Sequence, residues 1–173
     1  KVGPELQPAA TRRAVEARGG EVYDVGEDDH SYMWRPAVEE HAQNKDYDVA
    51  GRLVASVRDT AEVVLRERLL PLSEAREILR RYRPLIFRRI EIHLLNVFAD
   101  QGPELARQTM MDRPLFDDYR FKHEYARLVG ARFGLLERRE RAEFLQWIAD
   151  GPDLSGFEQF AAREWGRAPT QEE

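Results

Sequence analysis

The sequence predicts an all-α protein, an α-solenoid of stacked helical hairpins with about seven helices. Apolar residues recur at helical spacing, and β-branched alternation is missing outside the fragment 22–25. Two stretches fifty residues apart, 85–100 and 135–150, share an order of paired apolar residues, paired arginines and a final Ala-Asp, and Gly-Pro follows both. Such repetition is typical of helical arrays, in which each unit buries its apolar face against its neighbours. The alternative is that two unrelated amphipathic helices share this ending.

The composition is that of a globular chain. Its 173 residues are 42% hydrophobic, which is enough for one core. The net charge of -5 argues against broad electrostatic capture of nucleic acid or of an anionic membrane. Because the chain has no cysteine, disulfides, thiolate zinc sites and cysteine nucleophiles are excluded, and a reducing cytoplasm is the expected location. Its apolar runs are too short to cross a bilayer. Since the sequence opens at Lys1, we interpret it as a piece of a larger protein.

The first 30 residues are predicted to form a linker or partly ordered lead-in, followed by a helical domain over 31–166 and a frayed tail over 167–173. Ser31 is the expected cap of a short helix that includes Trp34 and continues to Val38. The clearest amphipathic helix runs from Asp48 to about Arg68. Its apolar side comprises Val49, Leu53, Val54, Val57, Ala61, Val64 and Leu65. Its polar side comprises Arg58, Asp59, Glu62 and Arg66.

Proline and glycine divide the rest of the chain into further helices. Pro71 ends the long helix, and Ser73 is expected to cap the next one. The helix over 84–100 has apolar residues on two sides, which predicts an inner position between other helices. Gly102-Pro103 and Asp112-Arg113-Pro114 bound a helix between them. Further helices are expected over 117–133, 137–150 and 155–165.

No catalytic or cofactor motif stands out, so we expect no cofactor and no metal, and favour a non-enzyme. The acidic tract 27–29 with His30 resembles a hard-metal cluster, although a solvated segment is the simpler interpretation. His123-Glu124 lacks the second histidine of a zinc-protease helix, because position 127 is Arg127.

The densest positive charge lies between Arg76 and Arg89. The candidates for binding phosphate or an acidic partner are Arg80, Arg81, Arg83, Arg88 and Arg89. The preferred alternative is an ordinary solvated helix face, in which Glu77 pairs with Arg80 and Arg81 at helical spacing.

Arg88 and His93 resemble the arginine-histidine signature of the HEPN (higher eukaryote and prokaryote nucleotide-binding) ribonucleases, which are all-helical. The resemblance implies that His93 helps to activate a ribose hydroxyl and Arg88 supports phosphate charge, usually across a dimer. Arg89 departs from the polar Asn, Asp or His that this family has after its arginine. The simpler interpretation is that His93 is a half-buried core residue with a satisfied ring nitrogen.

The segments 31–39, 123–125 and 132–134 resemble helical regions of very large bacterial multidomain proteins, similar to signal-transduction NTPases and antiphage defence proteins. In such proteins a nucleotide-binding or effector module is joined to a long, HEAT-like helical sensor. The resemblance implies a non-catalytic interaction, sensor or scaffold segment whose partner is a protein or another domain of the parent chain. Two alternatives stay open, a ribonuclease that uses Arg88 and His93, and an adaptor that contacts nucleic acid through Arg80 to Arg89.

Overall fold

The computed structural model describes residues 29–44 and 48–151, and every regular element in these ranges is helical. The predicted all-α class is confirmed for this part of the chain. The fragment 22–25, the helix expected over 155–165 and the tail 167–173 lie outside it. The elements are α2 (Ser31–Trp34), α3 (Val49–Arg66), α4 (Leu72–Arg80), α5 (Leu85–Val97), η1 (Ala99–Gln101), α6 (Pro103–Met110), α7 (Arg113–Asp117), η2 (Tyr119–Phe121), α8 (Lys122–Arg132), η3 (Phe133–Leu135) and α9 (Arg138–Asp150).

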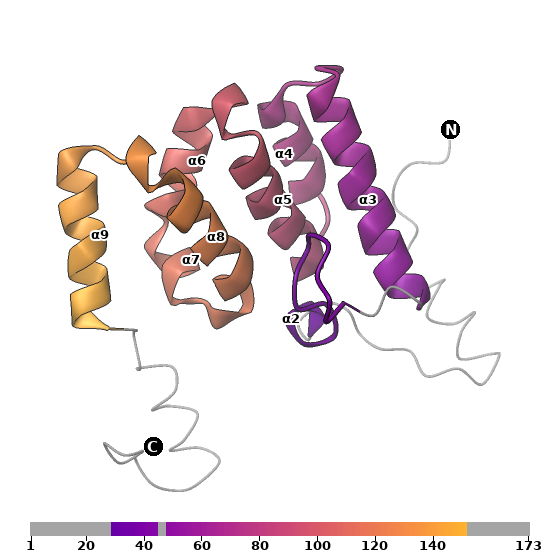
Figure 1. Ribbon diagram of the computed structural model, residues 1–173, viewed down its shortest axis with the longest axis horizontal. Coiled ribbons are helices and arrows are strands. Elements are labelled where there is room, and N and C mark those ends of the chain that lie inside the picture. Colours follow the sequence, from indigo (N-terminus) through magenta and orange to yellow (C-terminus); the bar gives the residue numbers. More distant parts are fainter. Residues whose placement is uncertain (1–28, 45–47, 152–173) are drawn as a thin grey trace, which may run out of the picture.

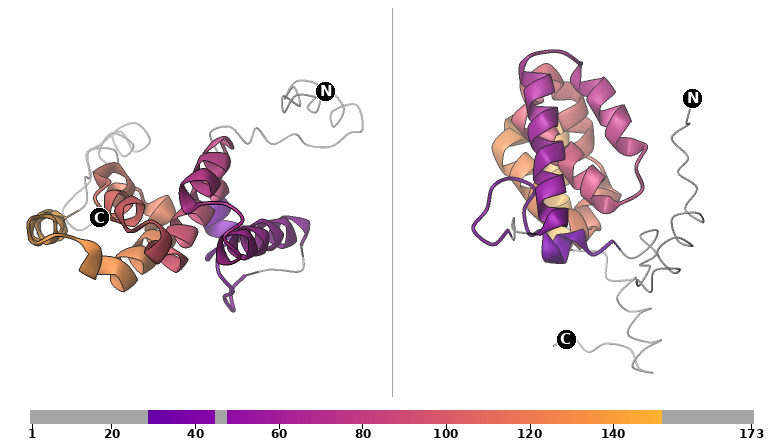
Figure 2. Two further views of the ribbon diagram at one scale, coloured as in Figure 1. Left: turned by 90° about the horizontal axis from the view of Figure 1, so that it is seen from above. Right: turned by 90° about the vertical axis from the view of Figure 1, so that its right-hand side faces the viewer.

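The long helices lie side by side in a row, with α3 at one end and α9 at the other (Figure 1). The view from above shows the same two helices at opposite ends of the long axis (Figure 2). The end of α3 lies near the end of α5, where the side-chain amide of Gln101 in η1 donates to the Leu65 carbonyl at 3.1 Å. Helix α4, which connects them, therefore runs in the opposite direction (Figure 1). Helix α5 lies inside the row and contacts α2, α3, α4, α6 and α8.

Helix α5 is the centre of the core. Every residue from Arg89 to Leu95 is buried, including three that carry polar or charged groups. The predicted inner position of this helix is therefore confirmed. Helix α8 runs alongside α5 in the same direction, because Glu124 bonds to Arg89 near the two starts and Arg132 donates to the Asn96 carbonyl near the two ends.

The predicted long amphipathic helix is confirmed as α3, and the Asp48 side chain caps it by accepting a hydrogen bond from the Gly51 N–H. Its predicted faces are partly wrong. Val49 and Leu53 are 75% and 60% exposed, whereas Arg58 is buried. Because α3 stands at the end of the row, its neighbours cover only one strip of it, and Arg58 reaches from α3 to the carbonyl of Val38.

Two of the expected serine caps are wrong. Ser31 is the first residue of α2, and its N–H is capped by the Asp29 carboxylate at 2.7 Å. The same helix stops at Trp34, short of Val38, because Pro36 disfavours helical backbone at the residue before it. In α4 the cap position is held by Pro71, so Ser73 falls inside the first turn.

The single helix expected over 117–133 is also wrong. This part of the chain folds as the end of α7, then η2 and α8. Pro114 lies in the first turn of α7, where a missing backbone N–H costs no helical hydrogen bond. It therefore helps to begin a helix as well as to end the preceding one. Asp118 separates α7 from η2, and its side chain accepts a hydrogen bond from the Arg120 N–H.

Helix α9 matches its prediction. Glu137 and Glu140 form a reciprocal capping box at its start, and Gly151 closes it with a φ of 77°, a conformation that glycine adopts without strain. The repeated pattern of 85–100 and 135–150 therefore marks two true helices, but in unequal surroundings. Leu95 is 0% exposed in α5, and its counterpart Leu145 is 55% exposed in α9.

Candidate functional site

A buried carboxylate organises part of the arginine cluster. Glu91 in α5 is 1% exposed, and its Oε1 accepts from Arg76 Nε at 2.7 Å, from Arg80 Nε at 3.0 Å and from Arg88 Nη1. Arg88 also lies 3.7 Å from Asp112. Three guanidinium groups therefore share one buried carboxylate, and charge-assisted hydrogen bonds fix their positions.

The five predicted binding arginines do not share one surface. Arg80 and Arg88 turn to Glu91, and Arg89 turns instead to Glu124 in α8. Arg81 and Arg83 are exposed and form no ion pair with any residue that the structure describes. The expected pairing of Glu77 with Arg80 and Arg81 is wrong among the residues that the structure describes, because Arg80 turns to the buried Glu91 instead.

The structure does not bring Arg88 and His93 together. Five residues of α-helix turn about 140° past a full circle, so the two side chains leave α5 in different directions. The Nε2 atom of His93 lies 2.8 Å from Glu62 Oε1 of α3, whereas Arg88 is held by Glu91 and Asp112. Each of the two is thus engaged by carboxylates of its own.

Arg89 and Glu124 form a buried ion pair between α5 and α8. Both are 1% exposed, and two hydrogen bonds join them, from Nε to Oε2 at 2.9 Å and from Nη2 to Oε1 at 2.8 Å. The pair also holds the segment after α2, because Glu124 accepts from the Val38 N–H and Arg89 donates to the Pro36 carbonyl, each at 3.1 Å. The sequence offered no signal for this pairing beyond the two residue types.

Two further arginines donate hydrogen bonds to backbone carbonyls of the same non-helical segment. Arg35 Nε donates to the Ala37 carbonyl at 3.0 Å, and Arg58 Nη1 donates to the Val38 carbonyl at 2.9 Å. Backbone carbonyls that leave a helix must find other donors when they are buried, and a guanidinium offers five. These arginines therefore serve the fold.

A smaller cluster lies beside this pair. Glu39 Oε1 accepts from Arg127 Nη1 at 2.6 Å and lies 2.8 Å from His123 Nε2. Burial alone raises the pKa of Glu39, but the hydrogen bond to His123 and the charge of Arg127 outweigh it, so that its pKa is lower than usual.

Glu39, His123 and Glu124 offer ligand atoms within 4.8 Å of one another, the spacing of a metal site. Their carboxylates are already neutralised by Arg89 and Arg127, whose guanidinium groups would repel a divalent cation. We assign no metal to them. Asp29 belongs to the acidic tract that resembles a hard-metal cluster. Its two carboxylate oxygens accept hydrogen bonds from the N–H groups of Ser31 and Ile86, so it stabilises the starts of two helices.

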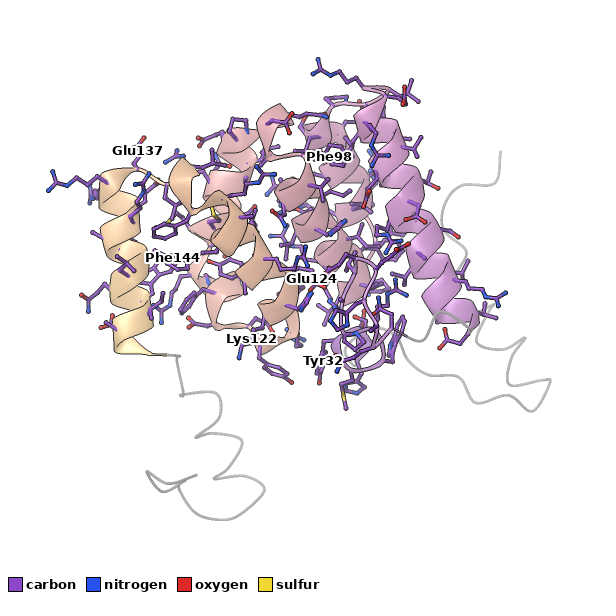
Figure 3. The ribbon with its side chains drawn as sticks, in the orientation of Figure 1. Tyr32, Phe98, Lys122, Glu124, Glu137 and Phe144 are labelled. Atoms are coloured by element: carbon purple, nitrogen blue, oxygen red, sulfur yellow. The ribbon has the colours of Figure 1, made fainter. Side chains whose placement is uncertain are left out.

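Two openings adjoin each other around the start of α8. The first, here called the apolar groove, has a volume of about 560 Å³ and lies between α7, α8 and α9. Its apolar lining includes Phe116, Val129, Phe144, Trp147 and Ile148. Figure 3 shows Phe144 on the side of α9 that faces α8.

The second opening, here called the cationic pocket, has a volume of about 530 Å³ and lies between the residues around α2, η2 and the first turns of α8. Its basic lining consists of Arg89, Arg120, Lys122, His123 and Arg127. Tyr119, Lys122 and Ala126 line both openings, which makes them neighbours on one surface. Of this lining only Arg89 was a predicted site residue; the spacing of 120, 123 and 127, typical of one helical face, was the available signal.

Comparison of the chain with family models, with curated proteins and with solved structures found no match. None of the helices in residues 29–44 and 48–151 has the length and hydrophobicity that a membrane span requires.

Proposed function

We propose that this chain is a non-catalytic interaction segment of a larger protein, built like an α-solenoid, which binds an amphipathic helix of a partner in the apolar groove. The observation that carries the proposal is the open apolar side of α9. Ile148 is 57% exposed at the groove, and Leu145 is similarly exposed on the same helix. Exposed large apolar side chains beside an apolar groove are typical of a site for another protein.

The walls of the groove favour a helix as the occupant. Phe116, Phe144 and Trp147 form a mutually packed aromatic cluster, with ring centroids 5.5 to 5.7 Å apart, and they make a firm floor between α7 and α9. Inner helices of the row have neighbours on more than one side, whereas α9 stands at the end of the described row. A partner helix with apolar residues at positions i, i+3 or i+4, and i+7 would continue the same packing.

The chemistry of the charged residues also favours binding over catalysis. Arg88 and His93 are each engaged by carboxylates and lie on different sides of α5. The reducing cytoplasm remains the location that a cysteine-free chain favours.

The proposal is tested by selecting helical peptides from a displayed library against the whole chain of 173 residues. We expect enriched peptides with large apolar residues on one helical face. Ile148→Glu should weaken their binding about tenfold or more, because a charge would enter the apolar contact. Leu69→Glu is the matched control, since Leu69 is an exposed leucine outside the groove, and it should change the affinity less than about twofold.

Two outcomes would contradict the proposal. One is a selection in which no helical peptide is enriched, or in which the enriched peptides bind the Ile148→Glu variant equally well. The other is binding that appears only after residues 152–173 are removed, because the chain would then occupy its own groove.

A further inference from the structure

The wall of the cationic pocket is rich in basic residues. Arg89, Arg120, Lys122, His123 and Arg127 contribute to its wall, and no aspartate or glutamate does. This is a local exception in a chain whose net charge is -5. A concave surface of one charge sign concentrates ions of the opposite sign.

Three carboxylates behind the wall hold the basic groups in place. The Asp118 carboxylate accepts hydrogen bonds from Arg120, at 2.9 Å from Nε and at 2.7 Å from Nη2. Glu39 pairs with His123 and Arg127, and Glu124 pairs with Arg89. Lys122 forms no ion pair with a described residue. The four arginine and lysine charges exceed the three carboxylates, so the pocket is positive as well as pre-organised.

One donor in the pocket wall lacks an acceptor. The Nε and Nη2 atoms of Arg89 are paired with Glu124 and Pro36, but its buried Nη1 has no hydrogen-bond partner among the described residues. Buried guanidinium donors are rarely left unpaired, since the lost hydrogen bond with water is costly. Because this atom is buried, it adds positive charge to the pocket wall rather than a donor that a ligand reaches directly.

The start of α8 adds a further attraction for an anion. This helix of 11 residues follows η2 directly, so the Lys122 N–H bonds to the Tyr119 carbonyl and the helix start contributes its partial positive charge rather than a free donor at Lys122. Lys122 and His123, in that turn, line the pocket. The first N–H groups of a helix carry a partial positive charge and commonly bind phosphate.

Tyr32 and Tyr119 complete the pocket with two hydroxyl groups 3.3 Å apart. Their mutual hydrogen bond raises the pKa of Tyr32 further above its usual value. An unshifted tyrosine is already protonated at neutral pH, so Tyr32 adds no negative charge to the pocket. Figure 3 shows Tyr32 and Lys122 near each other along the lower edge of the molecule, with Glu124 further inside.

We infer that the cationic pocket binds the phosphoryl group of a small organic phosphate, a ligand that goes beyond the proposed docking of a helix. Several charged donors that converge with a helix start suit the multiple oxygens of a phosphoryl group better than a single carboxylate. Tyr119 and Ala126 continue from this pocket into the apolar groove, and they place an apolar surface beside the phosphoryl group for the organic part of the ligand. The volume of about 530 Å³ is in the range of small-molecule sites.

Isothermal titration calorimetry with adenosine 5′-monophosphate, adenosine and inorganic phosphate tests the inference on the whole chain. We expect adenosine to bind at least about tenfold more weakly than its monophosphate, because it lacks the group that the arginines recognise. Inorganic phosphate that binds as tightly as the nucleotide would identify the free ion as the ligand. A tighter nucleotide would identify an organic phosphate.

Variants connect the binding to this pocket. Lys122→Ala and Arg127→Ala should each weaken binding of adenosine 5′-monophosphate about tenfold, since each removes a charge-assisted contact at an exposed position. Arg139→Ala is the matched control, because Arg139 is an exposed arginine of α9 outside the pocket, and it should leave the affinity within about twofold. Circular dichroism melting of the variants checks that they are folded.

The inference is overturned by three results. The first is no binding of either phosphate compound at millimolar concentration. The second is equal binding of adenosine and its monophosphate, or equal weakening by Arg139→Ala and Lys122→Ala. The third is a short RNA that binds at least about tenfold tighter than the nucleotide, because the pocket would then belong to a nucleic-acid surface. Ile148 does not line the cationic pocket, so these results are distinguishable from a failure of helix docking.

Discussion

At the scale of single residues, arginine acts here largely as an internal donor. Arg35, Arg58 and Arg89 are buried, and all three donate to backbone carbonyls of the segment between α2 and α3. This segment includes Pro36 and cannot continue α2, so its carbonyls need donors from elsewhere. A guanidinium supplies several donors at once and remains charged, which makes a buried acid such as Glu124 necessary as its counterion.

Glu124→Ala should therefore destabilise the protein by about 3–5 kcal/mol, because it leaves the Arg89 charge buried and unpaired. Urea unfolding at neutral pH measures the change. The control is Arg66→Ala, which removes an exposed partner of Glu62 and should change the free energy of unfolding by less than about 0.5 kcal/mol. A cost of Glu124→Ala as small as that of the control would show that the ion pair is not desolvated.

At the scale of elements, the same residue pattern produces helices with different roles. The stretches 85–100 and 135–150 form α5 and α9, as their apolar spacing and their Gly-Pro endings predict. Helix α5 is enclosed by five other helices, whereas Phe144 is the single residue of α9 that is fully buried in the described structure. A hydrophobic pattern sets which face of a helix is available for packing, and its neighbours decide how much of that face is covered.

The leucines at equivalent positions of this repeat make a matched comparison. Leu95→Ala should cost about 2–5 kcal/mol, as truncation of a fully buried leucine does. Leu145→Ala should cost less than about 0.5 kcal/mol, because its side chain already lies mostly in solvent. Chemical unfolding of both variants checks the difference, and equal costs would mean that α9 is as enclosed as α5.

At the scale of the whole molecule, the row of helices has a well-packed middle and a weaker end. Helix α5 draws α2, α3, α4, α6 and α8 together. Helix α9 is attached through the aromatic contacts of Phe144 and Trp147, a salt bridge from Glu140 to Arg107, and the Arg113 hydrogen bond to the Gly151 carbonyl at 3.3 Å. Local stability follows the amount of buried apolar contact, so it should decline from α5 toward α9.

Native-state hydrogen exchange should show this gradient. The amides of α5 are expected to exchange only through global unfolding, with protection about equal to the full free energy of unfolding. The amides of α9 should open separately and exchange at least about tenfold faster. Mass spectrometry of proteolytic fragments measures both regions at once. Equal protection of α5 and α9 would indicate a single cooperative unit that includes the groove.

Local signals along the chain were sufficient to predict part of this fold. Helical spacing, proline and glycine predicted the all-α class, the inner character of α5 and the boundaries of α9, because these signals act between residues a few positions apart. The Ser31 and Ser73 caps were wrong for different reasons: the Asp29 carboxylate bonds to the Ser31 N–H, and α4 begins directly after Pro71, so that Ser73 lies inside its first turn.

The pairing of charged residues could not be predicted in this way, because it depends on how the helices pack. Arg89 was predicted to lie on a binding surface with Arg80 and Arg83, but it is paired with Glu124, 35 residues further along the chain. The cationic pocket likewise joins Arg89 of α5 to residues around α2 and α8. Such pairings depend on which helices are neighbours and on the cost of burying an unpaired charge, and neither quantity is encoded in the local spacing of residues.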